Sequence, residues 1–379
     1  MAIVKQVTGA RKGMKDFIDF PYTIYRVDPN WCPLPRFERK QFFSPQNPSM
    51  ANMEVAYFVA YDGERPIGRV TAHTDEGHNR HYKTRQGFFG FYEALDEPAV
   101  APLLMQAVER WVRERRMTSV IGPMNFTTKH ELGFLTEGFQ YPPTILMPYT
   151  KAYYPRQMAD LGYRVEKELV AYRLDRRTPL PENLPRMVNR LMEKHGGDIT
   201  IRAIDMTRFY EDVETMRRIY NSAWDGNWGF IPMEIDEMND MAKQLKFFAE
   251  LPFITLVFKK NRPAAFLLPM PDINEVFFKI PDGRLFPTGF LKLLRHKRYI
   301  RTGSILLMGV MPEYRLQGLE LIMFDRLMRD ALKQNHYDYL ETTWILADNY
   351  LMCRGMDYLG AQLNKRYIVV KKELSPLQE

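Results

Sequence analysis

One stretch of the chain, Ile305 to Ala331, restricts the possible folds more than any other. It opens with a short apolar run rich in β-forming residues, Ile305 to Val310, which predicts a buried strand. Pro312 then ends the strand because it has no N–H for a β-ladder. After a polar loop, Gly318 precedes apolar residues that recur at helical spacing from Leu319 to Leu327. The stretch therefore predicts a strand, a tight loop and a helix in succession.

The loop between this strand and this helix brings free backbone N–H groups toward one point. The first four N–H groups of an α-helix have no partner within the helix, and the helix dipole adds partial positive charge at the same end. Residues Arg315 to Leu319 lie at that junction. We therefore expect an anionic ligand such as a pyrophosphate to bind there.

The same residues resemble the CoA-binding motif of the GNAT acyltransferase superfamily, which is a strand, then Gln/Arg-x-x-Gly-x-Gly/Ala, then a helix. Arg315, Gly318 and the strand ending Val310-Met311-Pro312 match this motif, whereas Glu320 stands where a small residue is usual. The resemblance implies that acetyl-CoA or another acyl-CoA serves as co-substrate. The residues that it assigns to cofactor binding are Val310, Met311, Arg315, Leu316, Gln317, Gly318, Leu319 and Asn349.

The segment that follows is similar to the closing half of the same family. Tyr337 to Ile345 predicts a strand, Asn349 opens a short helix that stops at Gly360, and Gln362 to Val370 predicts a last strand. The family often places a general-acid tyrosine seven residues after that asparagine. In this chain the position holds Met356.

Three residues of this segment are candidates for catalysis. Glu341 lies on the strand that would face the thioester, and a carboxylate on a central strand is costly unless it is paired or working. Glu341 is therefore the candidate base. The alternative is that its side chain points to solvent at the end of the strand. Tyr350 and Tyr358 are the candidate acids for a departing thiolate, and nothing in the spacing chooses between them.

The order of predicted elements occurs twice along the chain, as strand, helix, hairpin, strand, helix, strand, helix, strand. A polar, proline-rich run from Asp175 to Pro185 separates the two copies. We therefore predict an α/β (α+β) protein with two tandem GNAT-like domains, each a mixed, mostly antiparallel sheet flanked by helices. The expected parts are a domain at 1–175 with a long insertion at 125–149, a linker helix at 176–198 and a domain at 199–379.

The first predicted domain has no phosphate loop. Asp96-Glu97-Pro98-Ala99 stands where the second has Arg315 to Gly318. Two carboxylates repel an anion, and the proline removes a donor. We therefore expect acyl-CoA to bind in the second domain alone.

Two regions are candidates for binding the acceptor. Asn125 and Glu131 belong to the polar part of the first insertion, and insertions at strand ends are where sites are often built. Trp224 and Trp228 flank Asp-Gly-Asn after the second domain's first helix, a region that borders the acceptor site in GNAT-like proteins. The structural alternative for Asn125 and Glu131 is the ordinary polarity of a loop. For Trp224 and Trp228 it is a packed aromatic loop.

Composition narrows the function classes. The net charge of +7 over 379 residues is modest. The basic runs at 113–116 and 295–298 lie at the ends of predicted helices, where cations complement the helix dipole. Nucleic acid is therefore not a favoured partner. Two cysteines and scattered histidines predict no disulfide framework and no metal site. No apolar run is long enough to span a bilayer, and a secretory signal is missing. We expect a cytoplasmic protein without a membrane partner, and oligomerisation stays open.

The function that these patterns favour is an acyl-CoA-dependent N-acyltransferase, with an acetyltransferase preferred. The acceptor is a small-molecule or peptide amine that attacks the thioester directly, without a covalent enzyme intermediate. One alternative of the same fold is a transferase that uses aminoacyl-tRNA. The other is a non-catalytic GNAT-like binding protein, because Glu320 and Met356 depart from the motif.

Overall fold

A computed structural model describes residues 2–9, 12–334 and 336–375. The first half (residues 2–175) contains the following elements: β1 (Ala2–Val7), α1 (Lys12–Ile24), α2 (Arg36–Phe42), β2 (Met53–Asp62), β3 (Arg65–Asp75), α3 (Glu76–Tyr82), β4 (Gln86–Ala94), α4 (Val100–Glu114), β5 (Ser119–Gly122), β6 (Phe134–Glu137), α5 (Tyr154–Asp160) and β7 (Arg164–Asp175). The connecting helix α6 is shorter than expected, Leu184–His195.

The second half (residues 199–375) repeats much of this order. Its elements are β8 (Ile199–Ala203), α7 (Phe209–Trp224), α8 (Ile235–Lys246), β9 (Thr255–Lys259), β10 (Arg262–Pro271), α9 (Asn274–Phe277), α10 (Gly289–Leu294), β11 (Thr302–Val310), α11 (Leu319–Gln334), β12 (Tyr339–Thr342), β13 (Ile345–Leu346), α12 (Tyr350–Tyr358) and β14 (Gln362–Glu373). No helix in the described parts of the chain is both long and apolar enough to cross a membrane.

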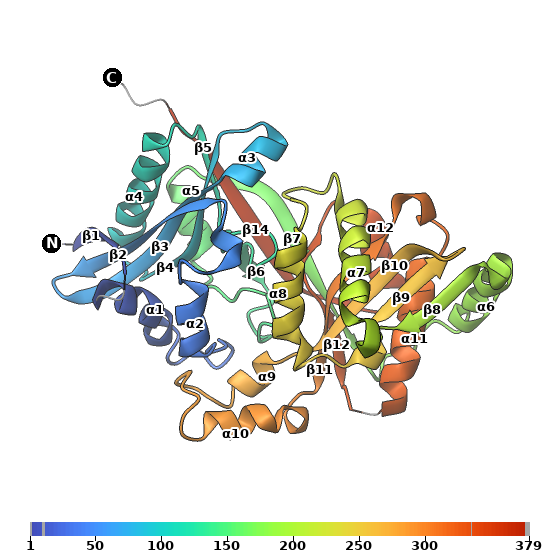
Figure 1. Ribbon diagram of the computed structural model, residues 1–379. Helices are drawn as coiled ribbons and strands as arrows, with labels where there is room; N and C mark the ends of the chain where they lie inside the picture. Colours follow the sequence, from blue (N-terminus) through green and yellow to red (C-terminus); the bar gives the residue numbers. More distant parts are fainter. Residues whose placement is uncertain (1, 10–11, 335, 376–379) are drawn as a thin grey trace.

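Both halves contribute to one mixed, mostly antiparallel sheet with helices on its faces (Figure 1). The strand order is β1-β2-β3-β4-β5-β14-β7-β12-β11-β10-β9-β8. One parallel pair occurs at the corresponding place in each half, β4 with β5 and β11 with β12, and each is connected through an amphipathic helix, α4 or α11. This arrangement confirms the predicted fold class.

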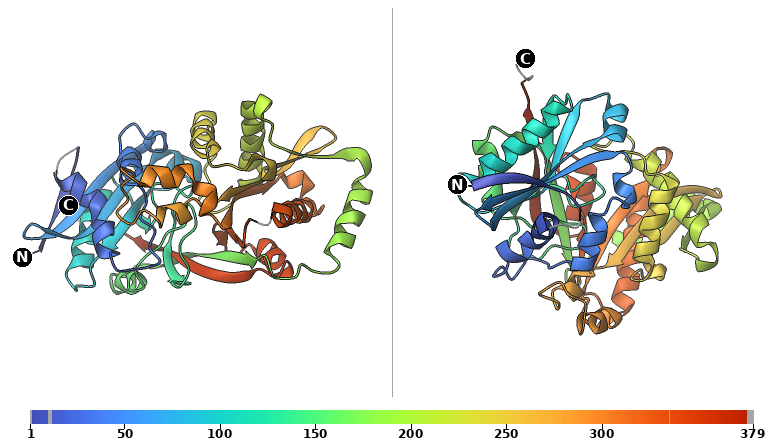
Figure 2. Two further views of the ribbon diagram at one scale, coloured as in Figure 1. Left: turned by 90° about the horizontal axis from the view of Figure 1, so that it is seen from below. Right: turned by 60° about the vertical axis from the view of Figure 1, so that its left-hand side comes forward.

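The two closing strands lie at the centre of the sheet and cross between the halves. We expected each half to end with a strand of its own sheet, but β14 pairs with β5 of the first half and β7 pairs with β12 of the second. The two strands also pair with each other along most of their length, from Gln362↔Arg173 to Lys371↔Arg164. Figure 2 shows both running through the junction. The halves therefore cannot separate without breaking the sheet.

Pro21 lies inside α1, which continues to Ile24. A proline inside a helix cannot donate to the carbonyl four residues earlier, which here belongs to Phe17. The buried Arg69 of β3 donates to that carbonyl instead, from Nη1 at 2.8 Å. The proline-rich segment 28–50 that follows holds a second helix, α2. The carbonyl that Pro21 leaves free thus holds Arg69 in place.

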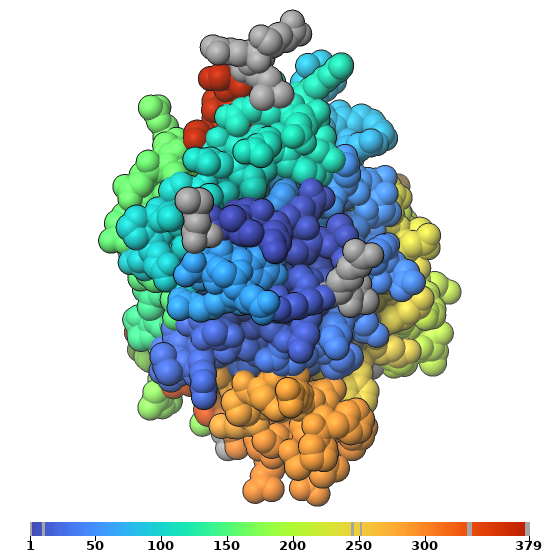
Figure 3. Space-filling view, turned by 90° about the vertical axis from the view of Figure 1, so that its left-hand side faces the viewer, coloured from blue at the N-terminus to red at the C-terminus, as the bar shows by residue number. Residues whose placement is uncertain are grey.

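The segment between β10 and β11 packs against the first half. Its two short helices, α9 and α10, lie beneath the α1–α2 region, where Arg36 N donates to Gly283 O at 2.9 Å. The thiol of the buried Cys32 contacts Asn274 O at 3.7 Å. Figure 3 shows this segment, in orange, against the lower edge of the first half. One wall of the first half is thus supplied by the second.

Candidate functional site

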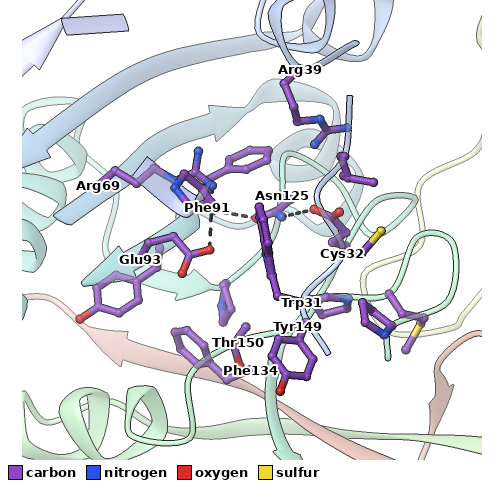
Figure 4. A pocket seen from close by; sticks show the side chains of 18 of the residues that line it. Trp31, Cys32, Arg39, Arg69, Phe91, Glu93, Asn125, Phe134, Tyr149 and Thr150 are labelled. Atoms are coloured by element: carbon purple, nitrogen blue, oxygen red, sulfur yellow. Dashed lines mark hydrogen bonds and ion pairs between the residues drawn. The ribbon is translucent and has the colours of Figure 1, made fainter. Parts of the chain in front are cut away.

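A cavity of about 100 Å³ lies in the first half, where β4 and β5 diverge (Figure 4). Helices α1 and α2, strand β3 and the first insertion complete its walls. The lining residues are Ile18, Pro21, Tyr22, Trp31, Cys32, Leu34, Arg39, Phe43, Arg69, Phe91, Tyr92, Glu93, Pro123, Asn125, Glu131, Gly133, Phe134, Pro143, Met147, Pro148, Tyr149, Thr150 and Asn274. Asn125 and Glu131, two of the expected substrate residues, are therefore in its wall, while their contact with a substrate stays a prediction.

Asn125 holds the diverging strands in place. Its Oδ1 accepts from Phe91 N at 2.7 Å, where β4 adopts a positive φ of 49°. Its Nδ2 donates to Glu131 Oε2 at 2.6 Å, and its backbone N–H donates to Glu131 O at 3.0 Å. A positive φ is uncommon for a phenylalanine, so the backbone depends on this fixed partner. One side chain thus orders both the strand irregularity and a carboxylate of the cavity.

Glu93 is the functional candidate that the sequence analysis missed. It is 8 % exposed, and its Oε2 accepts from the hydroxyls of Tyr25 and Tyr154, each at 2.7 Å. Its Oε1 lies 3.9 Å from Arg69 Nη2. Burial raises the pKa of Glu93 to about 7, although Arg69 and the two tyrosines oppose that rise. The signal was a charged residue in the apolar run 87–94.

In the second half, the predicted phosphate loop has the expected form. Leu316 and Gly318 have positive φ values of 59° and 79°, and α11 begins at Leu319. Within the described residues, the N–H groups of Gln317, Gly318 and Leu319 donate to no acceptor. Three other assigned amides are already paired: Met311 N donates to Ala264 O at 2.9 Å, Arg315 N to Pro312 O at 3.3 Å and Asn349 N to Leu346 O at 2.9 Å. Backbone donors without an acceptor at a helix N-terminus suit a pyrophosphate.

One side of this loop is closed by α6. His195 Nε2 lies 3.0 Å from Gln317 O, and Lys259 Nζ donates to Gln317 Oε1 at 2.6 Å. A Cβ on Gly318 would lie 2.5 Å from a methyl group of Leu191, so the position also needs glycine for space. Arg315 points away and donates from Nη2 to Ala223 O at 2.7 Å. Helix α6 therefore closes one side of the loop, and Leu319 at the start of α11 is fully buried.

The strand divergence of the second half contains aromatic side chains. β11 and β12 pair from Thr302 to Ile305 and then separate. Trp224 donates from Nε1 to Met308 O at 3.0 Å, and its ring meets that of Trp344 edge-on at 5.9 Å. Trp228 packs with Tyr149 of the first half and Trp344 in one apolar cluster. The two predicted substrate tryptophans therefore lie between the divergence and the first half.

The predicted catalytic residues lie in three different settings. Glu341 is buried, with Oε2 at 2.7 Å from Lys365 Nζ and Oε1 at 3.2 Å from Arg173 Nη1, so it links β12 to β14 and β7. Tyr350 is 70 % exposed. Tyr358 donates to Asn183 Oδ1 at 2.8 Å, beside α6. Their catalytic roles stay predictions, and for Glu341 the geometry offers a structural role.

Asn349, assigned by resemblance to cofactor binding, has a local partner. Its side chain accepts from Met352 N at 3.3 Å and so caps α12. The helix begins where the sequence predicted. Val310 is buried in the core of the second half.

Comparison with known proteins finds relatives that match nearly the full length of the chain. The sequence is 33 % identical to Protein YghO of Escherichia coli over 369 residues, covering 96 % of this chain and 94 % of that protein. It is 31 % identical to the bacterial ceramide synthase of Caulobacter vibrioides over 368 residues, covering 95 % of each. No family model matches the chain.

Solved structures share the fold at low identity. A tandem GNAT protein from the clavulanic acid biosynthesis pathway superposes with a TM-score of 0.60 at 10 % identity and covers both chains fully. An N-acetyltransferase from Sphaerobacter thermophilus gives 0.54 at 13 % identity, covering 99 % of this chain and 96 % of that one. These identities carry information on the fold alone.

Proposed function

Because the chain belongs to the GNAT superfamily, in one family with YghO and a bacterial ceramide synthase, we propose that it is an N-acyltransferase acting on a long-chain amino alcohol. The 31 % identity to a protein named ceramide synthase, over nearly the full length of both chains, is the observation that carries this proposal. A ceramide is the amide of such an amine with a fatty acid. The donor in the proposal is an acyl-CoA.

The open loop before α11 supports the donor part of the proposal. The N–H groups of Gln317, Gly318 and Leu319, which have no acceptor within the described residues, would bind the pyrophosphate of CoA, assisted by the dipole of a 16-residue helix. The pantetheine arm would then run along β11 toward its divergence from β12. At the corresponding place in the first half, Asp96, Glu97 and Pro98 precede α4, and this sequence disfavours an anion.

The chemistry in the proposal is direct transfer. The amine nitrogen attacks the thioester carbonyl, a C–N bond forms and the C–S bond breaks. A base first takes a proton from the ammonium, so that the neutral amine can attack. The nitrogen loses a second proton as the amide forms, and the thiolate takes up a proton and leaves as CoA. The fixed amides keep the donor in place for this attack, which is the contribution that positioning makes to such reactions.

The test is an assay of purified protein with sphinganine and either acetyl-CoA, octanoyl-CoA or palmitoyl-CoA. We expect an N-acyl product by mass spectrometry and release of free CoA. No amide from any of these donors would overturn the proposal. Product from charged tRNA alone would support the aminoacyl-tRNA alternative instead.

A matched pair of variants at Leu316 tests the donor site. Leu316 is 84 % exposed, so its side chain contributes little to folding. Leu316→Asp adds a negative charge beside the open amides and should weaken acyl-CoA binding about tenfold. Leu316→Asn has the same shape without the charge and tolerates the positive φ, so it should bind normally. Equal affinities of the two variants would place the pyrophosphate elsewhere.

A further inference from the structure

We propose that the cavity of the first half binds the amino head group of the long-chain acceptor before transfer, with its ammonium beside the carboxylates of Glu93 and Glu131. This inference rests on the proposed function, because it takes the acceptor to be an amine. It assigns the recognition of the acceptor to the half that has no phosphate loop. The lining residues and their orientation are shown in Figure 4.

The carboxylates of the cavity have unused acceptor capacity. Both tyrosine hydroxyls on Glu93 go to Oε2, so within the described residues its Oε1 accepts no hydrogen bond. Glu131 receives Asn125 on Oε2, and the described part of the chain offers it no cation within 4.0 Å. Two buried or half-buried carboxylate oxygens without donors favour a ligand with several N–H or O–H groups. An ammonium with a neighbouring hydroxyl has them.

The arginines of the cavity are already engaged. Arg39 donates from Nε and Nη2 to both oxygens of Glu38, at 2.6 and 2.7 Å. Arg69 donates from Nη1 to Phe17 O and lies over the Phe17 ring at 4.9 Å. Arg39 is thus paired with Glu38, whereas the carboxylate facing Arg69 is Glu93, 3.9 Å from its Nη2, and Arg69 Nε has no hydrogen-bond partner within the described residues. With Glu38 and Glu93 facing the two arginines, Glu131 adds a further negative charge to the cavity, and this excess favours an amine over a carboxylate or a phosphate.

The size and walls of the cavity suit a head group rather than a whole lipid. A volume of about 100 Å³ holds a few non-hydrogen atoms, and the chain of the acceptor would have to lie outside. Aromatic rings surround the polar groups: Trp31 stacks on Tyr25 with centroids 5.2 Å apart, and Phe91 and Phe134 line the wall. Ring faces attract an ammonium that has lost water.

The walls are held before any ligand arrives. Asn125 fixes both Phe91 and Glu131, and Arg69 is fixed by the carbonyl that Pro21 leaves free. The second half contributes Asn274, whose Nδ2 donates to Pro143 O at 2.9 Å. A preformed site loses little conformational entropy on binding. The cavity thus has the properties of a recognition site, and its wall, built by the first half, includes Asn274 of the second.

The experiment compares Glu93→Gln and Glu131→Gln with a matched control, Glu109→Gln. Glu109 is also buried and binds Tyr163, Arg113 and Lys372, but it lies outside the cavity. In the transfer assay, Glu93→Gln should raise the KM for sphinganine about 30-fold, since a hydrogen bond to a charged group contributes about 2 kcal/mol. The Kd for palmitoyl-CoA should stay unchanged, and Glu109→Gln should leave both values unchanged.

Binding without donor separates this inference from the proposed function. Wild-type protein, titrated by tryptophan fluorescence in mixed micelles, should bind sphinganine more tightly than a neutral alcohol of equal chain length. Glu93→Gln should remove that preference. If the wild type forms no amide product but keeps this preference, the proposed function fails and the amine site stands. An unchanged sphinganine KM in both cavity variants, or no preference for the amine, would overturn the inference.

Discussion

The two halves share one scaffold but differ where their parallel strands diverge. In the first half the divergence of β4 and β5 opens into a cavity that contains a buried carboxylate. In the second half, Trp224 and Trp344 lie at the divergence of β11 and β12, while the amides of 317–319 before and at the start of α11 have no acceptor among the described residues. The comparison suggests that a duplicated domain can divide donor and acceptor binding between its copies.

The helix that follows each divergence shows the same division. Before α4, Asp96 and Glu97 pair with Arg156 and Arg65, so surface ion pairs occupy the place of a phosphate. Before α11, the described residues supply no acceptor to three successive amides. A helix N-terminus that already has carboxylates beside it has little need of an anionic ligand.

The largest expected effect contrasts two buried carboxylates, Glu341 and Glu93. Glu341→Gln should lower the free energy of unfolding by roughly 4 kcal/mol, because Lys365 would remain buried with no opposite charge. Urea denaturation measures this. Adding Lys365→Met to the same variant should recover most of the loss. Full stability of Glu341→Gln with a large fall in kcat would instead support the catalytic role that the sequence suggested.

Glu93 should make stability fall as the pH rises. Its pKa is about 7 in the folded protein and near 4.5 in the unfolded chain, so the folded state binds more protons between these values. The stabilisation is complete below pH 4.5 and is lost as the pH rises through 7, a change of roughly 3 kcal/mol. The difference in unfolding free energy between the wild type and Glu93→Gln, measured across this pH range, isolates the contribution of Glu93. A pH-independent difference would contradict the account.

Asn125→Ala should affect the first half alone. The substitution leaves Phe91 N without an acceptor and releases Glu131, which should cost about 2 kcal/mol of unfolding free energy. The sphinganine KM should rise while the Kd for acyl-CoA stays constant. A change in the Kd for acyl-CoA as large as that in KM would mean that the two sites are not separate.

Trp224→Phe gives the smallest effect and concerns the second half. It keeps an aromatic ring but leaves Met308 O without its donor, which should cost about 1 kcal/mol of stability. The sphinganine KM should not change. A strong rise in that KM would show that the acceptor contacts Trp224, as the sequence resemblance suggested, and would weaken the contrast between the halves.

The features predicted from the sequence are those with local signals. The strand, loop and helix around Gly318 follow from apolar spacing, a proline and a glycine, and Asn349 caps α12 through a contact three residues away. The fold family followed from the same stretch. Asn125 and Glu131 could be selected because they are polar residues in a long insertion at the end of a strand.

The features that were missed depend on contacts far apart in sequence. Glu93 was visible as a charge in an apolar strand, but its partners Tyr25 and Tyr154 lie 68 and 61 residues away. The crossing of β7 and β14 depends on strand pairing between halves, which no local pattern encodes. Pro21 stays within a helix because a distant arginine replaces its missing hydrogen bond.

Hydrogen–deuterium exchange with and without palmitoyl-CoA tests the division of tasks most directly. We expect the donor to slow exchange of the amides at 317–321 and to leave those at 96–101 unchanged. Both sets lie at the start of a helix in matching positions, so each serves as the control for the other. Protection at 96–101, or none at 317–321, would contradict the assignment of the donor to the second half.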